Sequence, residues 1–140
     1  MPADAKLDML RSIPLFREMG KRELENVGRL ADTVDVPAGK VLMREGEFGS
    51  EMFVISSGTL AVERDGREVA RLGPGSVVGE IALLSEGPRT ATVTAAEPST
   101  LLVLAHREFH TLMEDSPDMR RCVTDELARR LRGLEADRAH

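Results

Sequence analysis

The sequence predicts an α+β protein in which an antiparallel β-roll, of the double-stranded β-helix, jelly-roll-like type, is flanked by N-terminal and C-terminal helices. Three observations predict it: apolar residues at helical spacing near the N-terminus, short β-rich runs separated by turn residues after them, and helical spacing again near the C-terminus. At 140 residues the chain is long enough for one ordinary domain and too short for two. We expect a single domain over 1–140, with helices at 1–31, the roll at 32–105 and helices at 106–140.

The N-terminal segment is predicted to be helical over residues 4–31, with an interruption just before Pro14. A proline disfavours the helical conformation of the residue that precedes it, so the helix should break there. After the break, Leu24, Val27 and Leu30 recur at helical spacing. We therefore expect two consecutive helices before the roll.

The central segment has the pattern of a roll because no stretch within it is long enough for a crossover helix. Leu60 and Val62 alternate with more polar neighbours, as in a half-buried strand. Asp65-Gly66 is a two-residue hairpin signal, because a type I′ turn needs positive φ at both central positions. The predicted strands lie in the runs TVDV, KVLMR, EMFVIS, TLAVER, REVARL, SVV, TATVTA and TLLVLA.

The C-terminal segment returns to helix. A short helix is predicted at His106–Glu114, and a final helix at 117–137, with Ser116 as N-cap and Pro117 at its first position. The apolar stripe of the final helix suits two roles, packing on the chain's own roll as a lid or pairing with a second copy as a homodimer, and the sequence leaves both open. The stripe consists of Met119, Val123, Leu127, Leu131 and Leu134.

Composition excludes several classes of protein. The net charge of −5 provides no basic field that would draw the chain to nucleic acid, and without Trp or Tyr it lacks the usual platforms for stacked bases. The single cysteine, Cys122, permits no internal disulfide. The start MPADAKLDML does not resemble a signal peptide, and the longest apolar run is far shorter than a membrane span. We expect a cytoplasmic protein with no membrane span and no direct nucleic-acid binding.

The segment GEIALLSEGPRTA, Gly79–Ala91, contains the parts of a small anion site. Gly79 lets a ligand approach the backbone closely, and the following residues can form one helical turn whose free N–H groups point at an anion. Arg89 offers a planar fork of donors that fits phosphate oxygens. Glu80 is acceptor-only, so it would need a ligand donor such as a ribose 2′-hydroxyl. Acceptor and cation together indicate a ribose phosphate.

Two patterns in the chain resemble those of the cyclic-nucleotide-binding domain family, which includes catabolite-activator-type regulators, cyclic-nucleotide-dependent kinases and gated channels. The first is LMREGEFGSEMFVISSG, with Gly46, Gly49 and Gly58 at the family's glycine positions; Met43 departs mildly from the family's Val, Ile or Cys. The second is VGEIALLSEGPRTATVTA, which matches the family's phosphate-binding cassette and places it at 78–91. Because both patterns occur in order, the resemblance covers nearly the whole chain.

The resemblance implies a role for each candidate site residue. Glu80 would accept the ribose 2′-hydroxyl and Arg89 would pair with the cyclic phosphate. Thr90 would place a hydroxyl near phosphate or a guanine amino group, and Arg130 of the last helix would reach back toward Glu80. The remaining residues would line the same pocket, the first four near the phosphate and the last two beside ribose and base: Gly79, Ile81, Ala82, Ala91, Val69 and Val78.

Alternative explanations were weighed for the same residues. Glu80 and Arg89 could form an ordinary surface ion pair, but the two matched patterns favour a cassette. His106 and His110 have the spacing of a zinc pair, yet no third ligand accompanies them, so a solvated helix face is the better interpretation. A metal-dependent enzyme of the cupin type needs histidines on its strands, and there is none before His106. We expect no catalytic residues, no metal and no cofactor.

The predicted function is that of a sensor that binds a cyclic mononucleotide, cyclic AMP in preference to cyclic GMP, and signals through its C-terminal helix. Two alternatives stay open. The chain could be the sensor half of a cyclic-AMP-responsive transcription regulator, whose helix-turn-helix does not follow within the 140 residues. It could also be a ligand-free interaction domain of the same fold.

Overall fold

The computed structural model of the chain describes residues 3–13, 16, 19–79, 87–125 and 128. The backbone forms two compact units. One runs from Leu30 to His110 and contains the strand-rich segment, whereas the other combines Met1–Arg29 with Thr111–His140.

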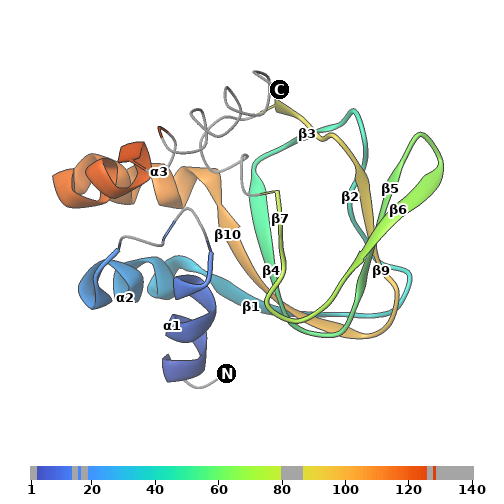
Figure 1. Cartoon of the computed structure of the whole chain (residues 1–140), viewed down its shortest axis with the longest axis horizontal. Coiled ribbons are helices and arrows are strands. Elements are labelled where there is room, and N and C mark those ends of the chain that lie inside the picture. The colour runs from blue at the N-terminus through green and yellow to red at the C-terminus, as the bar shows by residue number, and fades with distance from the viewer. Residues whose placement is uncertain (1–2, 14–15, 17–18, 80–86, 126–127, 129–140) are drawn as a thin grey trace, which may run out of the picture. The chain divides into compact units, whose positions relative to one another are not determined.

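The Leu30–His110 unit is a roll of short antiparallel strands (Figure 1). Each of the eight runs predicted from the sequence contains a strand, because the period-2 pattern that marks a strand is local. The described strands are β1 (Asp32–Val36), β2 (Val41–Met43), β3 (Phe48–Gly49), β4 (Glu51–Ser57), β5 (Leu60–Arg64), β6 (Arg67–Leu72), β7 (Val77–Val78), β8 (Gly87–Pro88), β9 (Thr92–Ala95) and β10 (Ser99–Ala105).

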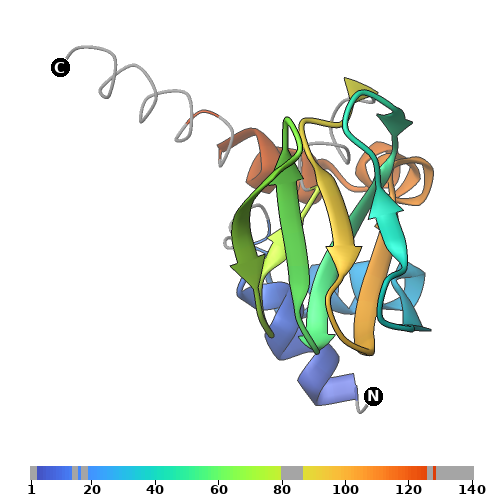
Figure 2. The same cartoon turned by 90° about the vertical axis from the view of Figure 1, so that its right-hand side faces the viewer.

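The strands form two four-stranded sheets, with the orders β1-β10-β4-β7 and β2-β9-β5-β6. All their pairings are antiparallel. Figure 2 shows β2, β9 and the β5–β6 hairpin side by side in the second sheet. The predicted α+β class and antiparallel roll are therefore confirmed.

The core of this unit lies between the two sheets and is filled from both. In β5 the buried Leu60 and Val62 alternate with the half-buried Ala61, as the sequence pattern predicts. Burial of each such aliphatic side chain stabilises the fold by about 1.5–3 kcal/mol. The buried cluster contains Val36, Phe53, Ile55, Leu60, Val62, Ala91, Val93, Ala95 and Leu101.

The predicted hairpin at Asp65-Gly66 joins β5 to β6. Both residues have positive φ, 53° at Asp65 and 77° at Gly66, which is the backbone that a type I′ turn requires. Arg64 and Arg67 pair directly beside the turn. The turn residues alone thus position this hairpin correctly.

One feature of the roll was not predicted, a two-residue ladder in which β3 pairs with β8. Phe48 lies opposite Pro88, and Gly49 lies opposite Gly87. Strands of two residues carry no periodic signal in the sequence. This ladder matters because Arg89 follows β8 directly.

The N-terminal helices are α1 (Ala3–Arg11) and α2 (Lys21–Leu30). The break between them is wider than predicted: residues 12, 13, 16, 19 and 20 lie outside both helices. Tight turns replace the helix there, with N–H groups of Phe16 and Met19 each bonding a carbonyl three residues back at 2.9 and 3.0 Å. The turns bury Phe16 between the two helices in sequence.

The C-terminal helices begin with α3 (His106–Asp115), and a further helix occupies residues 117–125. The predicted N-cap is confirmed, since the N–H of Met119 donates to Oγ of Ser116 at 3.3 Å. Nη1 of Arg120 donates to the carbonyls of Met113 and Glu114 at 2.6 and 2.8 Å, which closes the end of α3. In the described residues no helix is long and apolar enough to cross a membrane.

Candidate functional site

The backbone of Arg89 is fixed by a turn far away in the sequence. Its N–H donates to the carbonyl of Glu47, and its carbonyl accepts from the N–H of Gly46, both at 2.8 Å. The turn is closed by the N–H of Glu47, which donates to the carbonyl of Arg44 at 3.1 Å. Together with the β3–β8 ladder, these bonds determine where the Arg89 side chain starts.

The guanidinium of Arg89 lies across bare glycine backbone. A Cβ on Gly49 would lie 1.8 Å from Nε of Arg89, and a Cβ on Gly79 would lie 2.6 Å from its Nη1. Nη2 donates to the backbone carbonyl of Glu51 at 2.7 Å. The half-buried side chain can take this position only because neither glycine carries a side chain.

Gly79 also needs a conformation that other residues rarely adopt. Its φ is +77°, and a Cβ built there would meet the carbonyl oxygen of Glu51 at 2.6 Å. It follows β7, whose Val78 pairs with Phe53 of β4 and packs against the core cluster. The carbonyl of Glu51 is thus the point where the turn at Gly79 and the Arg89 fork converge.

The electrostatics of Arg89 combine burial and one nearby acid. Burial lowers the pKa of its guanidinium below the ordinary value, and the carboxylate of Glu51 opposes that shift. Arginine still carries its full charge at neutral pH. Among the described residues, the Glu51 carbonyl is the one hydrogen-bond acceptor that the guanidinium meets. The rest of its planar fork can therefore bind oxygens of an anion.

Thr90 and Ala91, which follow Arg89, differ in environment. Thr90 lies at an exposed bend, so its hydroxyl is open to a ligand or to water. Ala91 is buried in the core cluster of the roll, where it anchors the start of β9. The structure thus keeps both residues beside Arg89 but gives only Thr90 an accessible polar group.

Val69 lies in a β-bulge of β6. In the β5–β6 pair Val62 opposes Ala70 and Glu63 opposes Glu68, so Val69 is an extra residue without a partner on β5. It is 55% exposed although it is apolar. The bulge turns Val69 out of the regular alternation and leaves its side chain accessible for contact with a ligand.

Four predicted site residues lie outside the described part of the chain. They are Glu80, Ile81, Ala82 and Arg130. The described candidates Val78, Gly79 and Arg89 converge on the carbonyl end of Glu51 or the strand beside it.

Sequence reasoning missed two parts of the site. Gly49 was recognised only as a member of a pattern, and its close approach to Arg89 shows what that pattern position does. The Arg44–Glu47 turn was not assigned any role, although it holds the backbone of Arg89. The conserved-looking glycine spacing was the available signal, but which side chain fills the space depends on tertiary structure.

Two further sequence features have structural outcomes. His106 and His110 stack on α3, with ring centroids 5.4 Å apart and planes 16° apart. No group of three or more His, Cys, Asp or Glu side chains within the described ranges is placed to hold a metal ion. The arrangement around Arg89 is instead that of an anion-binding site: a fixed cation with unused donors, beside glycine backbone that a ligand can approach.

Comparison with known proteins points the same way. A family model for the cyclic nucleotide-binding domain matches residues 33–116. The cyclic nucleotide-gated potassium channel mll3241 of Mesorhizobium japonicum is 38% identical over 111 residues, which cover 79% of this chain and 31% of the channel. The chain therefore spans about a third of the length of that relative.

Two solved structures share the fold at similar identity. The N-terminal domain of a transcriptional regulator from Streptomyces coelicolor A3(2) has a TM-score of 0.84 and 32% identity, covering 91% of this chain and 94% of that domain. The regulatory domain of Toxoplasma gondii PKA, crystallised with cAMP, has a TM-score of 0.73 and 32% identity, covering 81% of this chain and 45% of that one. This chain belongs to the cyclic-nucleotide-binding domain family.

Proposed function

We propose that the chain is a sensor module that binds cyclic AMP in preference to cyclic GMP, has no catalytic activity of its own, and signals through its C-terminal helix. The observation that carries the proposal is the Arg89 guanidinium, which is fixed at its backbone, laid across Gly49 and Gly79, and equipped with donors that the described residues leave unused. A cyclic phosphate offers the oxygens that such a fork binds.

The preference for cyclic AMP has two supports. The relative from Toxoplasma gondii was crystallised with cAMP. Thr90, whose hydroxyl is exposed, tolerates either base and can assist guanine, so we expect the preference for adenine to be modest. A cytoplasmic location is part of the proposal, because one cysteine permits no internal disulfide.

Calorimetric titration with cyclic AMP, cyclic GMP and 5′-AMP tests the ligand directly. Two charge-assisted bonds from Arg89, each about 1.5–3 kcal/mol, predict that Arg89→Ala weakens cyclic AMP binding by about two to four decades. The matched control is Arg11→Ala, which removes the same charge from an exposed side chain of α1 and should leave affinity unchanged. Wild-type affinity in the Arg89→Ala protein, or no heat with either cyclic nucleotide, would leave the ligand-free alternative standing.

A second candidate is that this chain is the sensor part of a transcription regulator. The specific support is the Streptomyces coelicolor domain, which comes from a transcriptional regulator and is covered over 94% of its length. In such a regulator the apolar stripe that begins at Met119 and Val123 would pair with a second copy. Sedimentation with and without cyclic AMP separates the candidates: a dimer favours the regulator, and a monomer in both states favours a self-contained sensor.

A further inference from the structure

The position of Arg89 depends on the turn at Arg44–Glu47. Two backbone bonds at 2.8 Å connect this turn to residue 89, one on each side of the peptide unit. A shift of the turn therefore moves the Arg89 backbone with it, and a misplacement of about 1 Å is enough to spoil a binding or catalytic geometry. What anchors the turn also sets the geometry of the phosphate site.

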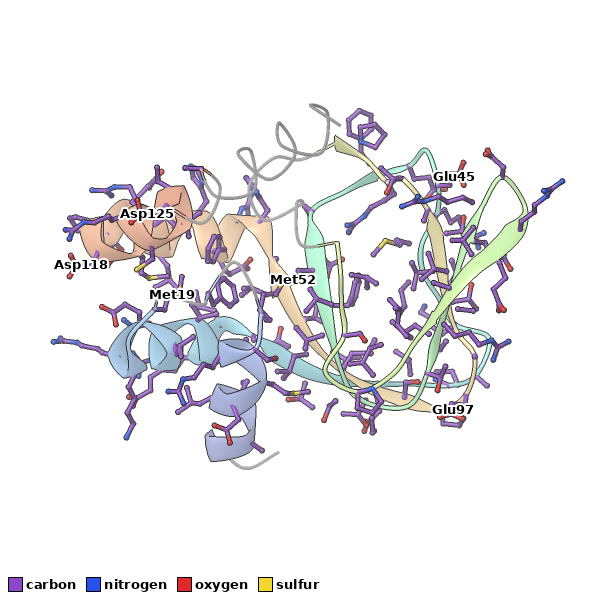
Figure 3. The ribbon with its side chains drawn as sticks, in the orientation of Figure 1. Met19, Glu45, Met52, Glu97, Asp118 and Asp125 are labelled. Atoms are coloured by element: carbon purple, nitrogen blue, oxygen red, sulfur yellow. The ribbon has the colours of Figure 1, made fainter. Side chains whose placement is uncertain are left out.

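Glu45 anchors the turn to the roll through both its backbone and its side chain. Its N–H donates to Oγ1 of Thr92 in β9 at 3.0 Å. Its Oε1 accepts the N–H of Asp65, at the tip of the β5–β6 hairpin, at 3.0 Å. Figure 3 shows Glu45 beside this hairpin, at the opposite end of the roll from Glu97. One residue thus joins the Arg89 turn to two strands that are distant in the sequence.

The chemistry of these contacts favours a positioning role over ligand contact. Thr92 lies on the outer side of β9, because its neighbour Val93 points into the core. The N–H of Asp65 has no ladder partner in a two-residue turn, and a carboxylate satisfies it with a charge-assisted bond. Glu45 holds its negative charge on that N–H while its backbone neighbour, Gly46, holds Arg89.

We propose that Glu45 is a positioning residue that holds the Arg89 turn against the β5–β6 hairpin and thereby sets the affinity for the cyclic phosphate. The hairpin also carries the bulge at Val69, so Glu45 connects the strand with the exposed apolar side chain to the cation. The inference rests on the proposed function of Arg89, because Glu45 acts on the ligand only through that side chain.

The test is a double-mutant cycle read by cyclic AMP affinity. Loss of one solvent-accessible hydrogen bond predicts that Glu45→Ala weakens binding by about two- to tenfold. Glu45→Gln keeps an acceptor oxygen and should stay within about twofold of wild type. In the Arg89→Ala background, measured by NMR titration because binding is weak, Glu45→Ala should have no further effect.

The control is Glu97→Ala, which removes an exposed carboxylate that accepts Oγ1 of Thr59 at 3.2 Å. It should leave affinity unchanged, whatever it does to stability. If Glu45→Ala fails to fold, Thr92→Val and Thr92→Ser replace it: the valine variant should weaken binding and the serine variant should not.

The possible results separate this inference from the proposed function. If Arg89→Ala weakens binding but Glu45→Ala does not, Glu45 has no positioning role. If Glu45→Ala costs the same factor with and without Arg89, it acts by another route and the inference is wrong. If Arg89→Ala itself binds as wild type does, both the proposed function and this inference fail.

Discussion

Substitution of Gly79 by alanine tests how tightly the site is built around Arg89. A methyl group at this position would be 2.6 Å from the carbonyl oxygen of Glu51 and 2.6 Å from Nη1 of Arg89, whereas ordinary contacts begin at 3.4 Å. The carbonyl belongs to the backbone of β4 and cannot swing aside. The guanidinium can, so we expect Arg89 to be displaced from the position in which it would meet a phosphate.

The matched control is Gly75→Ala. Gly75 has nearly the same backbone, with φ of +88° against +77°, but a Cβ there meets no described atom within 4 Å. The left-handed conformation costs an L-residue about 1–2 kcal/mol, so Gly75→Ala should lose about that much unfolding free energy. Gly79→Ala should lose about 2–5 kcal/mol, because overpacking adds about 1–3 kcal/mol.

Affinity separates the two variants more sharply than stability. Gly75→Ala should bind cyclic AMP as the wild type does, whereas Gly79→Ala should bind about tenfold to a hundredfold more weakly, the value of one charge-assisted bond. Urea unfolding gives the stabilities, and calorimetry under conditions where each variant is folded gives the affinities. Equal affinity in the two variants would show that the contact between Gly79 and Arg89 does not determine binding, and the reasoning would be refuted.

Three further predictions concern ligand choice and output. Glu80→Gln should reduce the preference for cyclic AMP over its 2′-deoxy analogue, and unchanged discrimination would assign Glu80 another task. Affinities for cyclic AMP and cyclic GMP should differ by less than about a hundredfold, or 2.7 kcal/mol; a larger ratio would require a base contact beyond Thr90. Cyclic AMP should slow hydrogen exchange in two separate segments, Gly79–Ala91 and Met119–Leu134, and protection of the first alone would remove the signalling role of the last helix.

The parts of the structure that were predicted depend on local sequence signals. The hairpin followed from Asp65-Gly66, since the turn type is set by those two residues. The alternation of Leu60 and Val62 identified a half-buried strand, and Ser116 identified a helix start. In each case the cause lies within a few residues of its effect.

The parts that were not predicted depend on residues that meet across the fold. The β3–β8 ladder has two residues per strand and leaves no period to detect. The bulge at Val69 is a matter of register between β5 and β6, which composition does not reveal. Glu45 reaches partners 20 and 47 residues away, so no local pattern marks it as more than a polar turn residue.

Arg89 was predicted as the anion-binding residue, but its surroundings were not. The sequence indicated a guanidinium beside a flexible glycine, and the structure adds that Gly49 and Gly79 both make room for it. It also shows that the carbonyl of Glu51 orients the fork before any ligand arrives. Such preorganisation lowers the entropic cost of binding, and it becomes visible only once the chain is folded.

The Arg89–phosphate contact is tested most directly by a crystal structure of the chain grown with cyclic AMP. The account predicts that Nε or Nη1 of Arg89 lies about 2.7–3.2 Å from exocyclic oxygens of the cyclic phosphate, with Nη2 still bonded to the carbonyl of Glu51. A nucleotide bound with its phosphate away from Arg89 would contradict it, as would a guanidinium that stays out of contact with the ligand.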